Sequence, residues 1–135
     1  MSSLSIATSG LAAASLRLQV SASNVANSSD TGPLPDANAS STAGFPPAYV
    51  PLRVNQVAGA GGGTAATVTT VSPSYVPQYD PGAPYAHKNG QVAAPNVDLA
   101  NEIVQQITAS YAFAANAKAI QAGSNTISAL LDIKI

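Results

Sequence analysis

Cysteine and tryptophan are absent from this chain of 135 residues, and charged residues make up only 8% of it. Without cysteine, the chain can form neither a disulfide framework nor a metal site with thiolate ligands. The net charge of −1 gives no electrostatic reason to expect nucleic acid or an anionic membrane as a partner. No run of about 18 apolar residues is available for a membrane span. These absences argue against nucleic-acid binding, membrane insertion and thiolate-bound metals.

Large apolar side chains are also scarce. The chain is 46% hydrophobic, but 27 of its residues are alanine, and leucine, isoleucine, valine and phenylalanine together supply only 29. Small domains bury a limited fraction of their surface even when their cores are richer than this. We therefore expect a chain that is weakly stable alone and that completes its core with neighbouring molecules.

Residues 1–27 predict a helix with one apolar side. Large apolar residues recur every seven positions, at Leu4, Leu11, Leu18 and Val25. Such a repeat forms a stripe along a helix, as in helices that pack on other helices. Arg17 is the only charge in the first 29 residues, whereas a helix facing water normally carries charges on its far side. The pattern indicates a helix that is surrounded by protein on most sides.

Residues 28–95 differ sharply, since they hold all ten prolines and every glycine except Gly10 and Gly123. Such a segment cannot be one helix. Residues 49–57 and 65–72 are rich in β-branched side chains and flank a glycine-rich stretch, which predicts a β-hairpin. Asn89-Gly90 predicts a second hairpin turn, between residues 85–86 and 91–92.

Residues 96–135 predict a second long helix. Pro95 disfavours helix at the residue before it, and Asn96 or Asp98 can cap the first turn. Apolar side chains then follow at the spacing of a packing seam, at Leu99, Ile103, Phe113, Ile120, Ile127 and Leu131. We predict a mainly α fold in which the two terminal helices form one discontinuous domain. They pair in a coiled-coil-like layer, and the insert carries a small β-hairpin.

Chemical sites are poorly supported. His87 is the only histidine, so one chain cannot form a multi-histidine metal site, and its Pro/Gly-rich setting favours a solvated loop residue. The run Asp36–Ser40 resembles the start of a calcium loop but lacks the glycine and glutamate needed at positions six and twelve. Asp98 and Glu102 could form an acid/base pair, although capping and the helix dipole explain both. We expect no catalytic residue, cofactor or metal.

Several motifs resemble a known family. The N-terminal signature of bacterial flagellar rod and hook axial proteins is similar to Ser9-Gly10-Leu11, Arg17-Leu18 and Ala22-Ser23-Asn24-Val25-Ala26-Asn27. The chain further resembles the proximal rod proteins of that family in three segments. These are Tyr79-Asp80-Pro81-Gly82-Ala83-Pro84, Asn89-Gly90, and Pro95-Asn96-Val97-Asp98-Leu99 with Glu102. The resemblance covers both ends of the chain and the segment from Tyr79 onward.

The resemblance implies a structural subunit of the proximal rod, with terminal helices that stack helically around an export channel and transmit motor torque through the periplasm. It implies three kinds of partner: copies of the chain, other rod proteins and the flagellar type III export apparatus, which cleaves no signal peptide. The expected assembly residues are the two apolar stripes together with Asn24 and Asn27. The residues alone leave open a soluble two-helix adaptor module, another axial protein of the same export family or, more remotely, an enzyme acting near Asp98 or His87.

Overall fold

The computed structural model describes residues 2–35 and 44–133. Two helices and four strands follow one another in the order α1, β1, β2, β3, β4, α2. Their bounds are α1 (Ser3–Ala26), β1 (Leu52–Ala58), β2 (Thr64–Thr70), β3 (Tyr75–Tyr79), β4 (Gln91–Pro95) and α2 (Leu99–Asp132). The two predicted helices are therefore present, and each differs from its predicted bounds by only a few residues.

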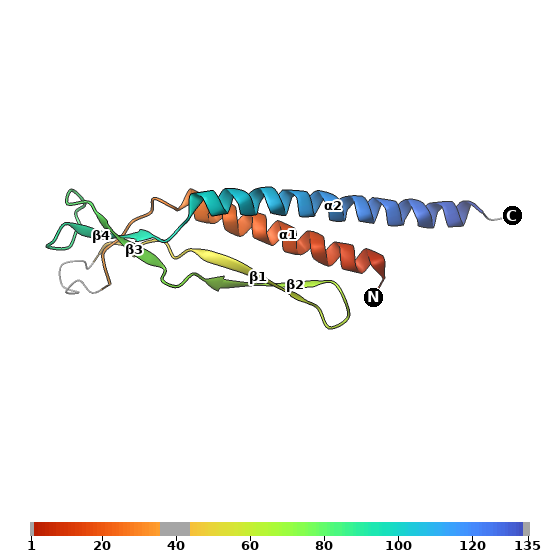
Figure 1. Ribbon diagram of the computed structural model, residues 1–135, viewed down its shortest axis with the longest axis horizontal. Coiled ribbons are helices and arrows are strands. Elements are labelled where there is room, and N and C mark those ends of the chain that lie inside the picture. The colour runs from red at the N-terminus through yellow and green to blue at the C-terminus, as the bar shows by residue number, and fades with distance from the viewer. Residues whose placement is uncertain (1, 36–43, 134–135) are drawn as a thin grey trace.

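The molecule is long and layered (Figure 1). Helix α1 lies in the middle, with α2 along one side and the β1–β2 hairpin along the other. Strands β3 and β4 lie beyond the first turn of α2 and form a separate part of the molecule, which we call the head. The helices run antiparallel, and α2 continues past the N-terminal end of α1. Among the described helices and strands, α2 packs only against α1, so most of its circumference is uncovered.

Local capping explains where the helices begin and end. The side chain of Ser2 accepts a hydrogen bond from the Ser5 amide at the start of α1, and Asp98 accepts from the amides of Ala100 and Asn101 at the start of α2. The prediction that Asp98 can cap this helix is confirmed. Helix α1 ends where the backbone and side-chain amides of Asn27 both donate to the Ser23 carbonyl.

The first predicted hairpin is confirmed. Strands β1 and β2 pair antiparallel, with Val54 opposite Val68. Gly62 and Gly63 adopt positive φ in the turn, a conformation that glycine tolerates best. The turn also docks on α1, because the Thr64 amide donates to Ser9 Oγ at 3.1 Å.

The second hairpin forms with a different partner from the one predicted. Gly90 has φ of 76°, but Asn89 lacks the positive φ that the predicted two-residue turn also needs, so that turn prediction was wrong. Strand β4 pairs instead with β3 across the loop of residues 80–90, with Gln91 opposite Tyr79. Residues 85–86 form a turn instead, and the hydroxyl of Tyr85 lies 2.7 Å from that of Thr31. The prolines of this region obscured β3, although an edge strand tolerates a missing amide hydrogen, as at Pro77.

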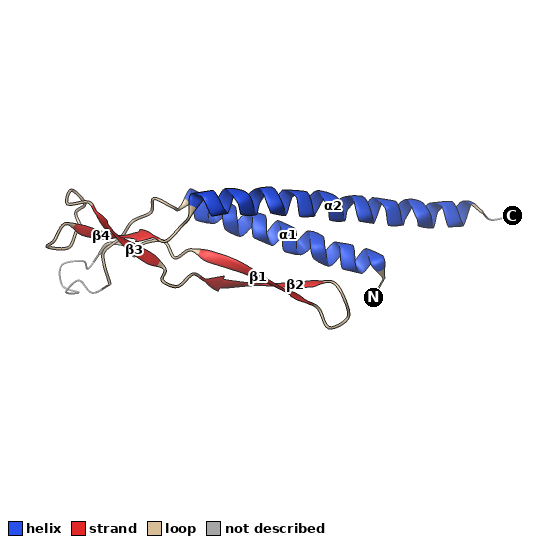
Figure 2. Cartoon of the chain, in the orientation of Figure 1, coloured by secondary structure: helices blue, strands red, loops and turns tan. Residues whose placement is uncertain are grey.

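The prediction of a mainly α fold was wrong. Helix makes up 47% of the described residues and strand 20%, and the strands form two small antiparallel sheets (Figure 2). The physical reason is a second core in the head, where Val92, Ala93 and Ala94 of β4 are buried. Gly32 forms a bridge to Ala93 on the edge of β4 away from β3, with hydrogen bonds of 2.9 and 2.8 Å. The insert thus has packing of its own and is more than a linker.

Candidate assembly surface

Small residues form the contact between α1 and α2. On α1 the side chains of Ala7, Ala14 and Ser21 are buried at seven-residue spacing. Ser21 Oγ donates to the Glu102 carbonyl at 2.9 Å, which fixes one end of the contact. Ala109 is the buried residue of α2, at 1% exposure. Helices with small side chains at their contact can approach closely, so large side chains are placed to either side of it.

Two glycines extend this close contact toward the N-terminal end of α1. A Cβ atom on Gly10 would lie 2.6 Å from Asn116 Oδ1, and one on Gly123 would lie 2.8 Å from Leu4 Cδ1. The register is therefore antiparallel, with Ser21 beside Glu102, Gly10 beside Asn116 and Leu4 beside Gly123. We call this line of contacts the seam. Ala7 and Ala14 lie between the leucines of the predicted apolar stripe, whereas Ser21, Ala109 and the two glycines were not identified as contact residues from the sequence.

The predicted assembly residues mostly remain accessible within the single chain. Only Asn24 is fully buried. The half-buried members are Leu4, Leu11, Val25, Asn27 and Ile120. The exposed members are Leu18, Leu99, Ile103, Phe113, Ile127 and Leu131. The chain therefore does not gather these residues into one internal core, and their role in assembly stays a prediction.

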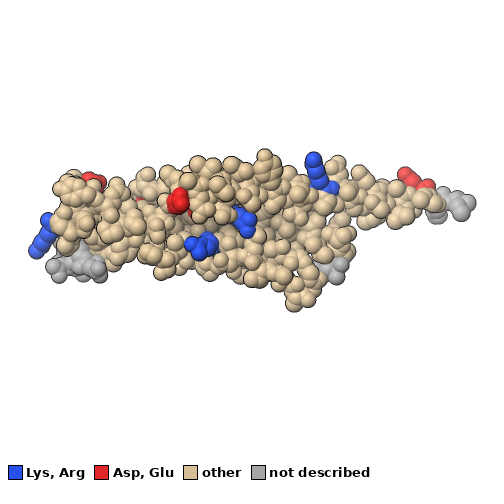
Figure 3. Space-filling view, in the orientation of Figure 1, with Lys and Arg blue, Asp and Glu red and all other residues tan. Residues whose placement is uncertain are grey.

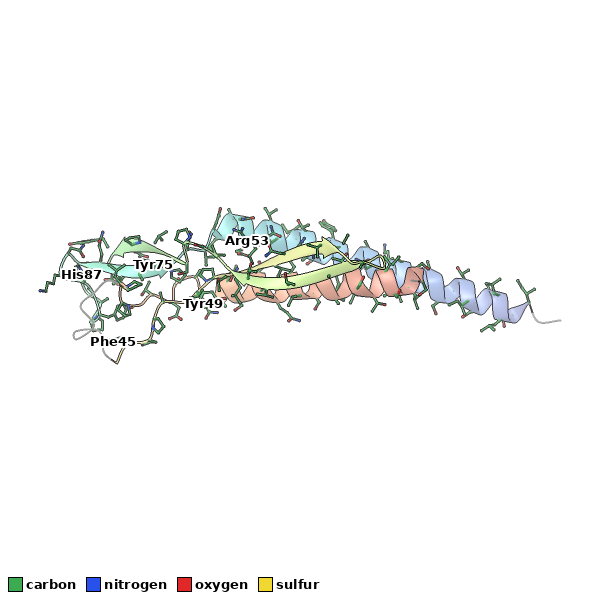
Figure 4. All side chains as sticks on the ribbon, turned by 90° about the horizontal axis from the view of Figure 1, so that it is seen from below. Phe45, Tyr49, Arg53, Tyr75 and His87 are labelled. Carbon is green, nitrogen blue, oxygen red and sulfur yellow. The ribbon has the colours of Figure 1, made fainter. Side chains whose placement is uncertain are left out.

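Asn24 joins three parts of the molecule and is 1% exposed. Its Nδ2 donates to the Leu52 carbonyl at 2.8 Å and to Glu102 Oε1 at 2.7 Å. Its Oδ1 accepts from the Leu52 amide at 3.0 Å and from the Tyr49 hydroxyl at 3.1 Å. Both donor hydrogens and both acceptor positions of the side-chain amide are thus used. Asn24 binds the start of β1 to the junction of the two helices, where Figure 4 shows Tyr49.

A polar cleft of about 330 Å³ lies beside Asn24. Its charged lining comes from Arg17 on α1, Arg53 on β1, and Asp98 and Glu102 at the start of α2. Both carboxylates hold the fold, since Asp98 caps α2 and Glu102 accepts from Asn24. The arrangement therefore supports a structural role for this pair better than acid/base chemistry.

His87 lies far from that cleft, at the outer end of the head (Figure 4). Its Nδ1 is 3.0 Å from Asn89 Oδ1 in the turn before β4. Within residues 2–35 and 44–133, no group of three or more histidine, aspartate or glutamate side chains could hold a metal ion. The candidate calcium loop at Asp36–Ser40 lies outside the described residues. No helix in the described part of the chain is long and apolar enough to cross a membrane.

The side of α2 away from α1 carries an exposed apolar stripe. It consists of Ile103, Val104, Ile107 and Tyr111, each more than half exposed, and we call it the back stripe. Tyr111 is 75% exposed. Sequence reasoning identified Ile103 but missed the other three, whose three-and-four spacing was a usable signal. Charged side chains are isolated spots on the face of the molecule drawn in Figure 3. The back stripe itself contains none, so it is suited to packing and poorly suited to electrostatic binding.

Comparison with known proteins finds two matching families. Residues 4–33 match the family described as flagella basal body rod protein, and residues 88–133 match the C-terminal region of flagellar basal body rod FlgEFG proteins. The chain is 38% identical over 136 residues to the flagellar basal-body rod protein FlgC of Salmonella typhimurium, covering 93% of this chain and 88% of that protein. FlgC of Escherichia coli is 37% identical with the same coverage. FlgC of Borreliella burgdorferi is 32% identical, covering 98% of this chain and 95% of that protein.

Proposed function

Since the chain belongs to the FlgC family of flagellar basal-body rod proteins and is a structural subunit of the rod, we propose that α1 and α2 form part of the rod wall. In this proposal the helices of successive subunits stack helically around a central export channel. Motor torque then passes along the rod, through the periplasm, by many helix contacts in parallel. Assembly with other basal-body proteins follows from membership of the family.

The observation that carries the proposal is the back stripe. Full burial of one isoleucine, valine or leucine side chain contributes roughly 1.5–3 kcal/mol. The back stripe leaves most of this free energy unused in the single chain, because α1 is the only described element on which α2 packs. Neighbouring subunits that cover the stripe would recover it, and they would need no charged partner to do so.

We further propose that α1 and α2 act as one discontinuous domain, with the insert on the outside of the rod. The matched family segments, residues 4–33 and 88–133, contain most of both helices, which supports treating them as a unit. The stripe of Leu4, Leu11, Leu18 and Val25 lies beside the seam, and its side chains are half-buried or exposed in the single chain. We propose that it contacts neighbouring subunits.

Delivery is proposed to proceed through the flagellar type III export apparatus without cleavage. Membership of the flagellar rod family supports this route. A mass spectrum of the chain recovered from basal bodies tests the point, and a shortened N-terminus would contradict it.

Replacing Ile107 by aspartate tests the rod-wall proposal. Because Ile107 is exposed in the single chain, Ile107→Asp should fold as the native chain does, with an unchanged circular dichroism spectrum. In cells that lack the native chain it should leave rods unfinished and abolish swimming, because a buried unpaired charge costs several kcal/mol at each contact.

Ala119→Asp is the matched control, an exposed residue of the same helix that is rotated by about a third of a turn from Ile107 and so lies outside the back stripe. Cells with Ala119→Asp should swim. Normal swimming of Ile107→Asp cells, with the chain present in their basal bodies, would show that the back stripe faces no neighbour.

A further inference from the structure

Helix α2 carries a second apolar surface where it extends beyond α1. Leu4 lies beside Gly123, so the residues after about position 124 have no counterpart on α1 (Figure 1). This overhang carries Ile127, Leu130 and Leu131, which are 53%, 66% and 72% exposed. We call these three residues the end patch.

The end patch continues the face of α2 that α1 covers. Ile127 follows Ala109 by about five helical turns at 3.6 residues per turn, so both point to the same side. Leu130 and Leu131 follow at three-and-four spacing from Ile127 and belong to that side as well. On this face of α2 the seam carries small residues, whereas the end patch carries large aliphatic ones. A helix-packing face thus continues without a helix of this chain to pack on it.

A shallow groove of about 500 Å³ lies nearby on the first turns of α1. Its lining residues are Ser2, Leu4, Ser5, Thr8, Ser9 and Ala12. We call it the α1 groove. Most of it faces away from the seam, because Thr8 and Ala12 are exposed whereas Ala7 and Ala14 are buried. Leu4 lies at the border, since it also contacts the seam beside Gly123.

Hydrogen bonding makes this groove apolar despite its serine and threonine residues. Ser5 Oγ donates to the Ser2 carbonyl at 2.9 Å, and Thr8 Oγ1 donates to the Leu4 carbonyl at 2.8 Å. Ser9 Oγ donates to the Ile6 carbonyl at 2.8 Å and accepts from the Thr64 amide. The hydroxyl hydrogens at these three positions are therefore engaged within the chain. What the groove offers a ligand is mainly carbon, which suits aliphatic side chains better than a polar group.

We propose that the end patch of one copy packs into the α1 groove of a neighbouring copy. The aliphatic side chains would act as knobs, and the small residues of the groove as the hole. Both surfaces lie toward the same end of the molecule, and neither contains a charged residue. A second copy is the occupant because every copy carries both halves of the contact. The inference rests on the proposed function, in which copies adjoin in the rod.

The contact is heterologous, since the two surfaces differ. Each added copy buries one end patch and one α1 groove and leaves one of each free. Contacts of this kind extend from copy to copy, whereas a contact between identical surfaces stops at a dimer.

Cysteine cross-linking tests this contact, because the native chain has no cysteine. The double variant Ala12→Cys/Leu130→Cys is expressed in cells that lack the native chain, and isolated basal bodies are treated with a short bismaleimide. We expect covalent products larger than a dimer. Within one chain the two sites are about 22 Å apart along the helices, from the register and 1.5 Å per residue, so a short reagent cannot join them.

The matched control is Ala26→Cys/Leu130→Cys, with the same alanine replacement at an exposed site at the other end of α1. It should give no ladder, and neither should either single variant. A second pair, Thr8→Cys/Ile127→Cys, should reproduce the ladder and guards against a defect specific to the first pair.

Three results would overturn the inference. These are a ladder of equal yield in the control, products that stop at the dimer, or no cross-link between copies in either pair although the cells swim and their rods contain the chain. In the last case the end patch does not contact another copy, and the proposed function still stands. Absence of the native chain from the rods of wild-type cells would instead refute the proposed function.

Discussion

At the scale of single residues, the Asn24 side chain satisfies backbone hydrogen bonds at the start of β1. Its side-chain amide pairs with both the amide and the carbonyl of Leu52, as a neighbouring strand would. From the sequence we included Asn24 among the assembly residues, as we did Asn27, which caps its own helix. The partners of Asn24 could not be predicted, because Leu52 and Glu102 are distant in the sequence and meet only after the layers have packed.

Replacing Asn24 by alanine should destabilise the chain by about 2–4 kcal/mol, because the Leu52 amide, the Tyr49 hydroxyl and Glu102 would each lose a partner in a buried setting. Urea unfolding of the purified chain, followed by circular dichroism at 222 nm, measures the change.

Asn55→Ala is the control for this experiment. Asn55 is exposed and donates one cross-strand hydrogen bond, to Thr69, so its loss should cost no more than about 0.5 kcal/mol. Equal effects of the two substitutions would mean that burial of Asn24 contributes nothing.

At the scale of elements, the bounds of both helices and of the β1–β2 hairpin could be predicted. They depend on local chemistry: the proline-free stretches, the Asp98 cap and the glycines of the turn. The contact residues of the seam could be predicted only in part. Leucine stripes such as Leu11 and Leu18 normally mark a contact, but here the backbones approach so closely that only small side chains fit between them.

Enlarging a seam residue should therefore separate the helices. Ala109→Leu should lower the stability of the chain by about 1–3 kcal/mol, since the added carbons must enter a contact where the present side chain is 1% exposed. Thermal unfolding followed by circular dichroism measures the loss. Ala114→Leu adds the same atoms at an exposed position of the same helix and should change the midpoint little. An unchanged unfolding midpoint for Ala109→Leu would show that the seam is loosely packed.

At the scale of the whole molecule, the layers are too thin to enclose a core. Apart from Val92, the buried hydrophobic residues within the described ranges are all alanines. Burial of alanine contributes little free energy, so the chain has to complete its hydrophobic contacts with other molecules. The scarcity of large apolar residues in the sequence indicated this. It could not indicate which surfaces would be left open, because that depends on how the layers stack.

We expect the purified chain to have an unfolding free energy below about 5 kcal/mol, at or under the low end for native domains. Its helix signal should rise with protein concentration, since association buries surfaces that the single chain leaves open. Circular dichroism over a hundredfold range of concentration tests this. A sharp unfolding transition that is independent of concentration would mean that the isolated chain is self-sufficient.

The sparse charge of the molecule bears on the conditions under which such an assembly works. Attraction between exposed charges weakens when dissolved ions screen it over about 10 Å at 0.1 M salt. The end patch, the α1 groove and the back stripe contain no charged side chain. Contacts made by these surfaces are therefore indifferent to such screening. A rod held together in this way would keep its strength whether the cell swims in fresh water or in brine.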